Sequence, residues 1–143
     1  MNQGGSVMTT LNPYLSFRDT AREALEFYHS VFGGELTLST YEEFHASEDP
    51  AELHKIMHGQ LESGGMTLMA SDTPNAMELT IGDNVTVSLS GQDEAELRGY
   101  WAALSEGATI TMPLEVAPWG DAFGQLTDRF GTNWMFNIGQ AAA

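Results

Sequence analysis

The side chain best suited to acid–base chemistry is His58, which together with Gln60 alternates with apolar residues in the stretch Met57-His-Gly-Gln-Leu61. Successive side chains of an extended strand point to opposite faces. If Met57 and Leu61 pack on a helix, His58 and Gln60 face a cavity. A histidine there could accept a proton near neutral pH, so His58 is the candidate catalytic residue. A hydrogen-bonded histidine without a catalytic task is the alternative.

Three histidines lie close together in the sequence, and their spacing raises the question of a metal. His54 and His58 are four residues apart, which would place both on one face of a helix. Such a pair normally needs a third ligand and often a glutamate base, whereas position 55 is lysine and residues 56–62 have the pattern of a strand. The chain has no cysteine, which excludes disulfides and thiolate ligands. We expect no metal site and no other cofactor.

The composition is strongly acidic, with 20 Asp and Glu residues, 5 Lys and Arg residues and a formal charge of −15. That field repels phosphate backbones, so we expect no nucleic-acid partner. The acidic clusters lack the alternating spacing of a calcium loop and are typical of a solvated surface. No apolar run is long enough to span a membrane, and residues 1–10 lack the features of a secretory signal. These features predict a cytoplasmic protein without a membrane partner.

The elements that position these residues come from a repeat. Two stretches, 21–37 and 94–110, align at an offset of 73 residues, which matches Phe27 with Tyr100, Tyr28 with Trp101, Val31 with Leu104 and Gly34 with Gly107. Each stretch is an apolar stripe at helical spacing that ends at glycine and continues as a strand. Repeated units usually share one architecture, so the repeat predicts two copies of one module.

The patterns of the two halves predict the order βαβββ twice, an α+β fold. We expect Asp19 or Thr20 to cap the first helix and Asp93 to cap the second. The expected elements are a strand at 11–17, a helix at 21–32, strands at 35–44, 56–62, 66–71 and 84–90, a helix from 93 to 106, and strands at 108–116, 123–127 and 133–138. We expect a flexible segment at 1–10, a first module at 11–72, a linker at 73–83, a second module at 84–138 and a tail at 139–143, all within one domain.

Several stretches together resemble a known family: LNPYLSF, ALEFYHSVFGGEL, KIMHGQL, MTLMASD and PLEVAPWGDAFGQLTDRFGTNWMFNI. The chain resembles the PhnB-like branch of the vicinal oxygen chelate superfamily, which includes glyoxalase I, extradiol dioxygenases and bleomycin-resistance proteins. The resemblance covers residues 11–138. It implies two βαβββ modules that form a curved, cupped mixed sheet with helices on the outer face, and a homodimer. Some members of the branch carry a ubiquinone-methyltransferase label, but the sequence has no glycine-rich loop for S-adenosylmethionine.

The resemblance also implies where metal-using members of the superfamily place their ligands. Those positions on the first, fourth, fifth and eighth strands fall on Asn12, Met69, Asn84 and Met135. Carboxamide and thioether groups do not suit Zn, Ni, Mn or non-haem Fe(II), which prefer imidazole and carboxylate ligands. We therefore expect these four residues to contact a small molecule and not a metal.

The other candidate ligand-binding residues lie on the expected cavity faces or in an aromatic loop. Methionines also fill cores, Trp119 could instead cover the core or a dimer seam, and Asp121 could be a turn residue. Besides the four above, the candidates are Tyr14, Ser16, Gln60, Thr86, Trp119, Asp121, Phe123 and Gln125.

Three classes of function fit these observations. We favour a protein that binds a small molecule of unknown identity without the usual metal ligands. The first alternative is an isomerase, lyase or dioxygenase-type enzyme of the same superfamily, either metal-independent through His58 or with displaced metal ligands. The second alternative is a dimeric interaction module with a vestigial cavity.

Overall fold

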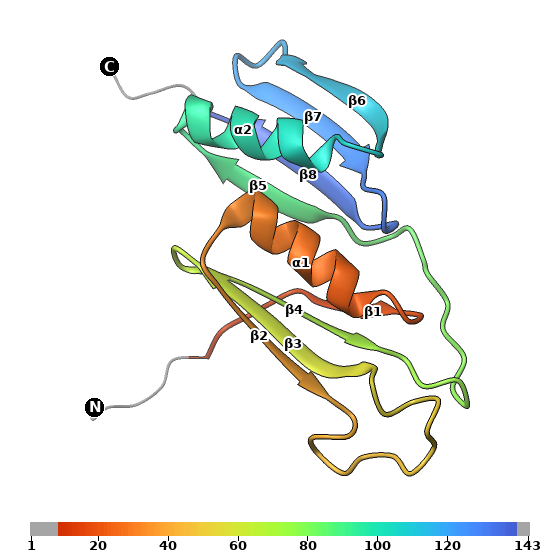
Figure 1. Cartoon of the computed structure of the whole chain (residues 1–143). Helices are drawn as coiled ribbons and strands as arrows, with labels where there is room; N and C mark the ends of the chain where they lie inside the picture. The colour runs from red at the N-terminus through yellow and green to blue at the C-terminus, as the bar shows by residue number, and fades with distance from the viewer. Residues whose placement is uncertain (1–8, 140–143) are drawn as a thin grey trace.

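The computed structural model describes residues 9–139, and in that range the order βαβββ occurs twice (Figure 1). The α+β fold of two βαβββ modules is therefore confirmed. The expected flexible segment at 1–10 and the tail at 139–143 lie outside the described residues, except for residues 9, 10 and 139. The elements are β1 (Tyr14–Phe17), α1 (Ala21–Phe32), β2 (Glu35–Thr40), β3 (Ile56–Ser63), β4 (Met66–Asp72), β5 (Val87–Gly91), α2 (Glu94–Leu104), β6 (Thr109–Val116), β7 (Ala122–Thr127) and β8 (Asn133–Ile138).

Each module forms one mixed four-stranded sheet. The strand orders are β1-β4-β3-β2 and β5-β8-β7-β6. In each sheet the first strand pairs in parallel with the last strand of its module, and the other pairs are antiparallel. Helix α1 packs on β2, β3 and β4, and α2 packs on β5 and β8, so both helices lie on the same side of the sheets in Figure 1. Within residues 9–139, no helix covers the opposite face of either sheet.

Helix α1 forms where the apolar periodicity predicted it, but its start is stabilised differently. Thr20 occupies the N-cap position without a side-chain capping bond. Instead, the Ala21 N–H donates to Asp72 Oδ1 at 2.9 Å. The expected cap by Asp19 or Thr20 is therefore wrong. The first N–H of the helix instead donates to a carboxylate at the end of β4. The expected cap of α2 is confirmed, since Asp93 Oδ1 accepts from the Glu96 N–H at 3.1 Å.

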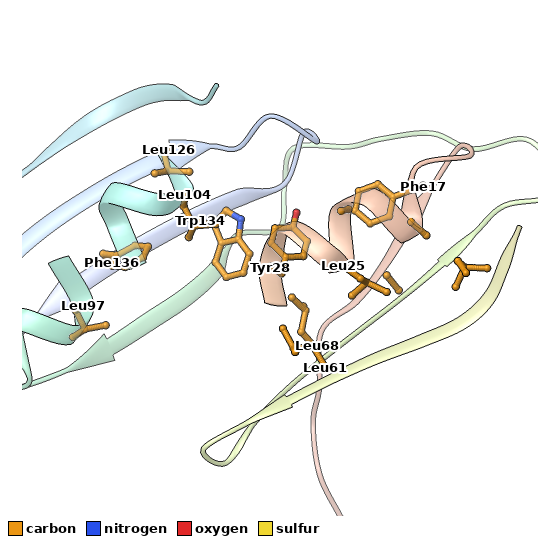
Figure 2. Close-up of a cluster of buried hydrophobic side chains, with 14 of the residues drawn as sticks. Phe17, Leu25, Tyr28, Leu61, Leu68, Leu97, Leu104, Leu126, Trp134 and Phe136 are labelled. Carbon is orange, nitrogen blue, oxygen red and sulfur yellow. The ribbon is translucent and has the colours of Figure 1, made fainter. Parts of the chain in front are cut away.

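The two modules share one hydrophobic core, and α1 joins them. Tyr28 is fully buried in α1, and its ring lies 5.6 Å from that of Trp134 in β8 (Figure 2). Its hydroxyl donates to Asp128 Oδ2 at 2.6 Å. One turn later along the helix, Phe32 meets Tyr100 of α2 edge-on with ring centroids 4.9 Å apart. These contacts make α1 a core element of both halves.

Three strands are shorter than the sequence pattern predicted. The first begins at Tyr14 instead of residue 11, the strand expected at 35–44 ends at Thr40, and the strand expected at 84–90 begins at Val87. Pairing of β5 with β8 starts at Val87 opposite Trp134, so the residues before it belong to the connection. Alternation along a strand at 84–90 predicts that Val85 faces the core together with Val87, but Val85 is 71% exposed. That expectation is wrong because alternation has structural meaning only where a strand is paired.

Within residues 9–139, neither helix has the length and hydrophobicity required to cross a bilayer.

Candidate functional site

The helix-free face of the first sheet gathers five of the residues expected at a site. Along β1 and β3, Phe17 and Leu61 are buried against the helix, whereas Tyr14 is 48% exposed. On this open face Met69 of β4 pairs with Tyr14 on one side and with Gln60 on the other. The structure therefore brings together Tyr14, Ser16, His58, Gln60 and Met69 on one surface.

Four side chains on this face form a hydrogen-bonded chain with a defined direction. Gln60 Nε2 donates to Glu62 Oε2 at 3.1 Å, which turns Gln60 Oε1 toward His58 Nε2 at 3.2 Å. Of the two neutral tautomers of His58, the one that fits this orientation of Gln60 carries the proton on Nε2, and its Nδ1 then accepts from the Tyr14 hydroxyl at 3.3 Å. The rings of Tyr14 and His58 lie 5.7 Å apart. This network places a ring nitrogen of His58 beside the hydroxyl of an exposed phenol.

The second sheet carries a separate group of candidates. Asp121 Oδ2 accepts from Asn137 Nδ2 at 3.0 Å, and Trp119 meets Phe123 edge-on at 5.9 Å. On the same face Gln125 of β7 pairs with Met135 of β8. Trp119 is 64% exposed. None of the hydrogen bonds or ring contacts found within residues 9–139 links these side chains to the Tyr14–His58 chain, so the candidates fall into two groups.

A hollow of about 330 Å³ separates the two modules beside the first group. Its walls are β1 (Tyr14–Phe17), residues 79–82 of the connection, Val85, Val87 and residues 130–133 of the turn before β8. Tyr14 and Ser16 line it, so the residue whose hydroxyl contacts His58 also borders the space between the modules. The sequence did not identify residues 79–82 or 130–133, because their turn-like composition contains no signal for a wall.

Not every candidate lies at this hollow. Asn84 and Thr86 are exposed and precede β5, and neither lines the hollow. Asn12 lines a second hollow of about 230 Å³, which also lies between residues of the two modules and includes Phe32 and Trp134 in its lining. The expected set of cavity residues is thus divided between the hollows and the two open faces.

Below the hollow, the turn before β8 is fixed by buried polar contacts. The Tyr28 hydroxyl approaches Thr132 Oγ1 at 3.1 Å, and Thr132 itself lines the hollow. Burial, followed by the charge of Asp128, raises the pKa of Tyr28 well above its ordinary value. Tyr28 therefore stays protonated and acts as a hydrogen-bond donor. The wall formed by residues 130–133 is held in place by these bonds.

The positions that hold metal in other members of the superfamily do not suit a divalent cation in this chain. Asn12 donates its amide to Thr10 Oγ1 at 3.0 Å, and Asn84 lies outside the sheet. Met69 and Met135 offer only thioether sulfur. Among residues 9–139, no three His, Asp or Glu side chains converge as a metal-binding group. The donor set therefore does not fit Zn, Ni, Mn or non-haem Fe(II).

Comparison with known proteins places this geometry in a family. The family model described as 3-demethylubiquinone-9 3-methyltransferase matches residues 9–136. Protein YjdN of Escherichia coli (strain K12) is 28% identical over 139 residues, which cover 90% of this chain and 94% of that protein. Protein PA1353 of Pseudomonas aeruginosa has a similar crystal structure, with 38% identity, a TM-score of 0.80, and coverage of 94% of this chain and 100% of that one.

A more distant structure shows the same fold. The putative 3-demethylubiquinone-9 3-methyltransferase, PhnB protein, from Bacillus cereus is 24% identical with a TM-score of 0.71, covering 92% of this chain and 100% of that one. The chain therefore belongs to the family described as 3-demethylubiquinone-9 3-methyltransferase, and it shares its fold with the PhnB protein and with a glyoxalase-related enzyme from Fulvimarina pelagi, which is 15% identical with a TM-score of 0.59.

Proposed function

We propose that this protein binds a small organic molecule in the hollow between its modules, without a divalent metal. The observation that carries the proposal is the position of Tyr14, which lines the hollow and whose hydroxyl lies 3.3 Å from His58 Nδ1. Pockets that combine apolar walls with a few oriented polar groups are the usual form of small-molecule sites. The lining includes the apolar residues Leu15, Val87 and Phe130, and it includes Tyr14 and Ser16, which carry hydroxyl groups.

Methyl transfer, which the description of the family names, is not part of the proposal. Sites for S-adenosylmethionine commonly use a glycine-rich loop that leads into a helix N-terminus. In this chain the loop between β1 and α1 is Arg18-Asp19-Thr20, without glycine. The first N–H of α1 already donates to Asp72. The residues at this position therefore do not fit the methyl donor.

Proton transfer is a second candidate function, and the Tyr14–His58 pair favours it. With Nδ1 of His58 as the acceptor, Tyr14 could take a proton from a bound molecule while its own hydroxyl proton passes to His58 Nδ1. In that case Tyr14→Phe abolishes turnover and leaves ligand affinity within a few-fold. A binding protein instead loses only the affinity contributed by one hydroxyl group.

The test of the main proposal is a thermal-shift and NMR screen of a fragment library against the full chain. Fragments that bind the folded state raise the melting temperature. Gly82 lines the hollow, and a Cβ built there would have only Asn84 Oδ1 nearby, at 3.7 Å, so Gly82→Phe should fill the space and abolish the hits. Gly99→Phe on α2 is the matched control, because a side chain there meets open space.

Two results would contradict the proposal. Hits that survive Gly82→Phe would place the ligand elsewhere. Hits that disappear after treatment with EDTA and return with zinc or manganese would show that binding needs a metal. The predicted homodimer is tested separately, by light scattering on the same samples.

A further inference from the structure

We infer that the ligand of the hollow between the modules is an uncharged, mainly apolar organic molecule, and that the hollow rejects anions. The inference rests on the proposed function and assigns the chemical class of its ligand. It starts from the lining: β1, residues 79–82, Val85, Val87 and residues 130–133 include no Asp, Glu, Lys, Arg or His. A charged ligand would find no counter-ion in these walls.

The positions of the basic residues strengthen this conclusion. The sequence contains five Lys and Arg residues, all within the described range, and none lines the hollow. Arg18 donates to the carbonyl oxygens of Thr73 and Pro74 at 2.9 and 2.7 Å, and these bonds hold the segment after β4 against the end of β1. Lys55 is 4% exposed and bonds to Asp19 Oδ1 at 2.7 Å.

The other three basic residues belong to the helix side of the molecule. Arg98 pairs with Glu94 of the same helix at 2.8 Å, and the Arg129 guanidinium lies 4.2 Å from the centre of the Phe27 ring in α1. Arg22 is exposed on α1, which packs on β2, β3 and β4 (Figure 1). Arg18 and Arg129 are sequence neighbours of the lining residues Phe17 and Phe130, but their guanidinium groups are engaged by backbone carbonyls and by the Phe27 ring, and no basic side chain is part of the lining.

A lining without charged side chains should select uncharged ligands over charged ones. Moving an unpaired charge from water to an apolar wall costs free energy, whereas an uncharged group loses little if it is hydrogen-bonded. An anion is also repelled by the net charge of −15. A cation is attracted by that charge at long range, but salt at about 0.15 M screens the attraction beyond roughly 8 Å. The residues that line the hollow therefore determine which ligands bind. They favour an uncharged molecule with a hydroxyl or carbonyl group near Tyr14 or Ser16.

The test uses three probes that share a phenylethyl group: 2-phenylethanol, 2-phenylethylamine and 3-phenylpropanoate. Each is titrated into the isotope-labelled full chain at neutral pH and about 0.15 M salt, and shifts of the backbone amide signals around the hollow give the affinity. We expect the alcohol to bind about tenfold or more tightly than the carboxylate, and more tightly than the amine. The reason is that an unpaired charge loses free energy when it leaves water for a wall without a counter-ion, whereas the hydroxyl group does not carry that cost.

A charge added to the wall supplies the reverse test. Ser16 is exposed on β1 and lines the hollow, so Ser16→Lys should improve carboxylate binding about tenfold relative to the alcohol. Ser90→Lys is the matched control, because it adds the same charge to an exposed position of β5 that does not line this hollow.

The outcomes separate the two proposals. Equal binding of alcohol and carboxylate, tighter binding of the amine, or no effect of Ser16→Lys overturns the uncharged class but leaves a binding hollow. Failure of all three probes to shift any signal from the hollow overturns this inference, and it overturns the proposed function as well only if the fragment library also gives no hits that Gly82→Phe abolishes.

Discussion

Asp72 offers the most direct test of how this fold is held together. It is 2% exposed at the end of β4, and its two carboxylate oxygens accept from the Ala21 N–H and the Ile56 N–H, each at 2.9 Å. Those bonds join the end of β4 to the start of α1 and to the start of β3. Asp72→Ala removes both acceptors and leaves two buried N–H groups, each of which costs about 1–3 kcal/mol when unpaired. We expect a loss of about 2–5 kcal/mol in the free energy of unfolding.

The measurement is urea unfolding near neutral pH, followed by far-ultraviolet circular dichroism, with comparison of midpoints at unchanged slope. Asp93→Ala is the control, because Asp93 makes only one exposed capping bond, and its loss should cost about 1 kcal/mol. Asp72→Asn keeps one carbonyl acceptor and should fall between the two. If Asp72→Ala costs no more than Asp93→Ala, the bonds seen at this carboxylate do not stabilise α1 and β3 as argued.

Three further predictions address packing, acid stability and ionisation. Gly124→Ala should destabilise the protein by about 1–3 kcal/mol in the same unfolding assay, because the new Cβ would lie 2.8 Å from the backbone Cα of Leu114; wild-type stability would refute the tight packing of β6 on β7. A hydrogen bond from Lys55 lowers the pKa of Glu52. Ionised Glu52 therefore stabilises the folded state at a pH above the ordinary glutamate pKa, and this contribution is lost as the pH falls through the lowered pKa. The stability advantage of wild type over Glu52→Gln should therefore shrink on acidification, and a constant difference would contradict it. The hydrogen bond to Glu96, followed by burial, raises the pKa of Tyr100 to about 12, and Glu96→Gln should return it toward the ordinary value in an ultraviolet phenolate titration; an unchanged titration would exclude this cause.

Local patterns predicted the elements that are regular over their whole length. The apolar stripe of α1 gave its bounds at Ala21–Phe32, and the alternation of β8 gave Asn133–Ile138, because in both cases every second or third side chain contacts the core. The pattern failed at Val85, which alternates correctly but lies before the first residue paired with β8. Periodicity reports the potential to form a strand, whereas pairing depends on where the partner strand begins.

The site was predictable only in part, for a related reason. Strand alternation correctly placed Tyr14, His58 and Gln60 on one face, because they lie on paired strands. It did not predict that residues 79–82 and 130–133 would complete a hollow, since these segments have no periodic pattern and are positioned by long-range contacts. The capping role of Asp72 was missed for the same reason: its partners Ala21 and Ile56 are 51 and 16 residues away.

The sharing of α1 between both halves has a consequence for how the chain folds during synthesis. The Tyr28 hydroxyl and its partner Asp128 are 100 residues apart, and Trp134, which packs on the same ring, comes later still. When the first module leaves the ribosome, the aromatic side of its helix therefore has no partner until almost the whole chain has been made. Contacts of such high sequence separation slow folding, and the waiting apolar surface is prone to aggregation. A nascent chain stalled after the first module should consequently recruit chaperones that the finished protein no longer needs.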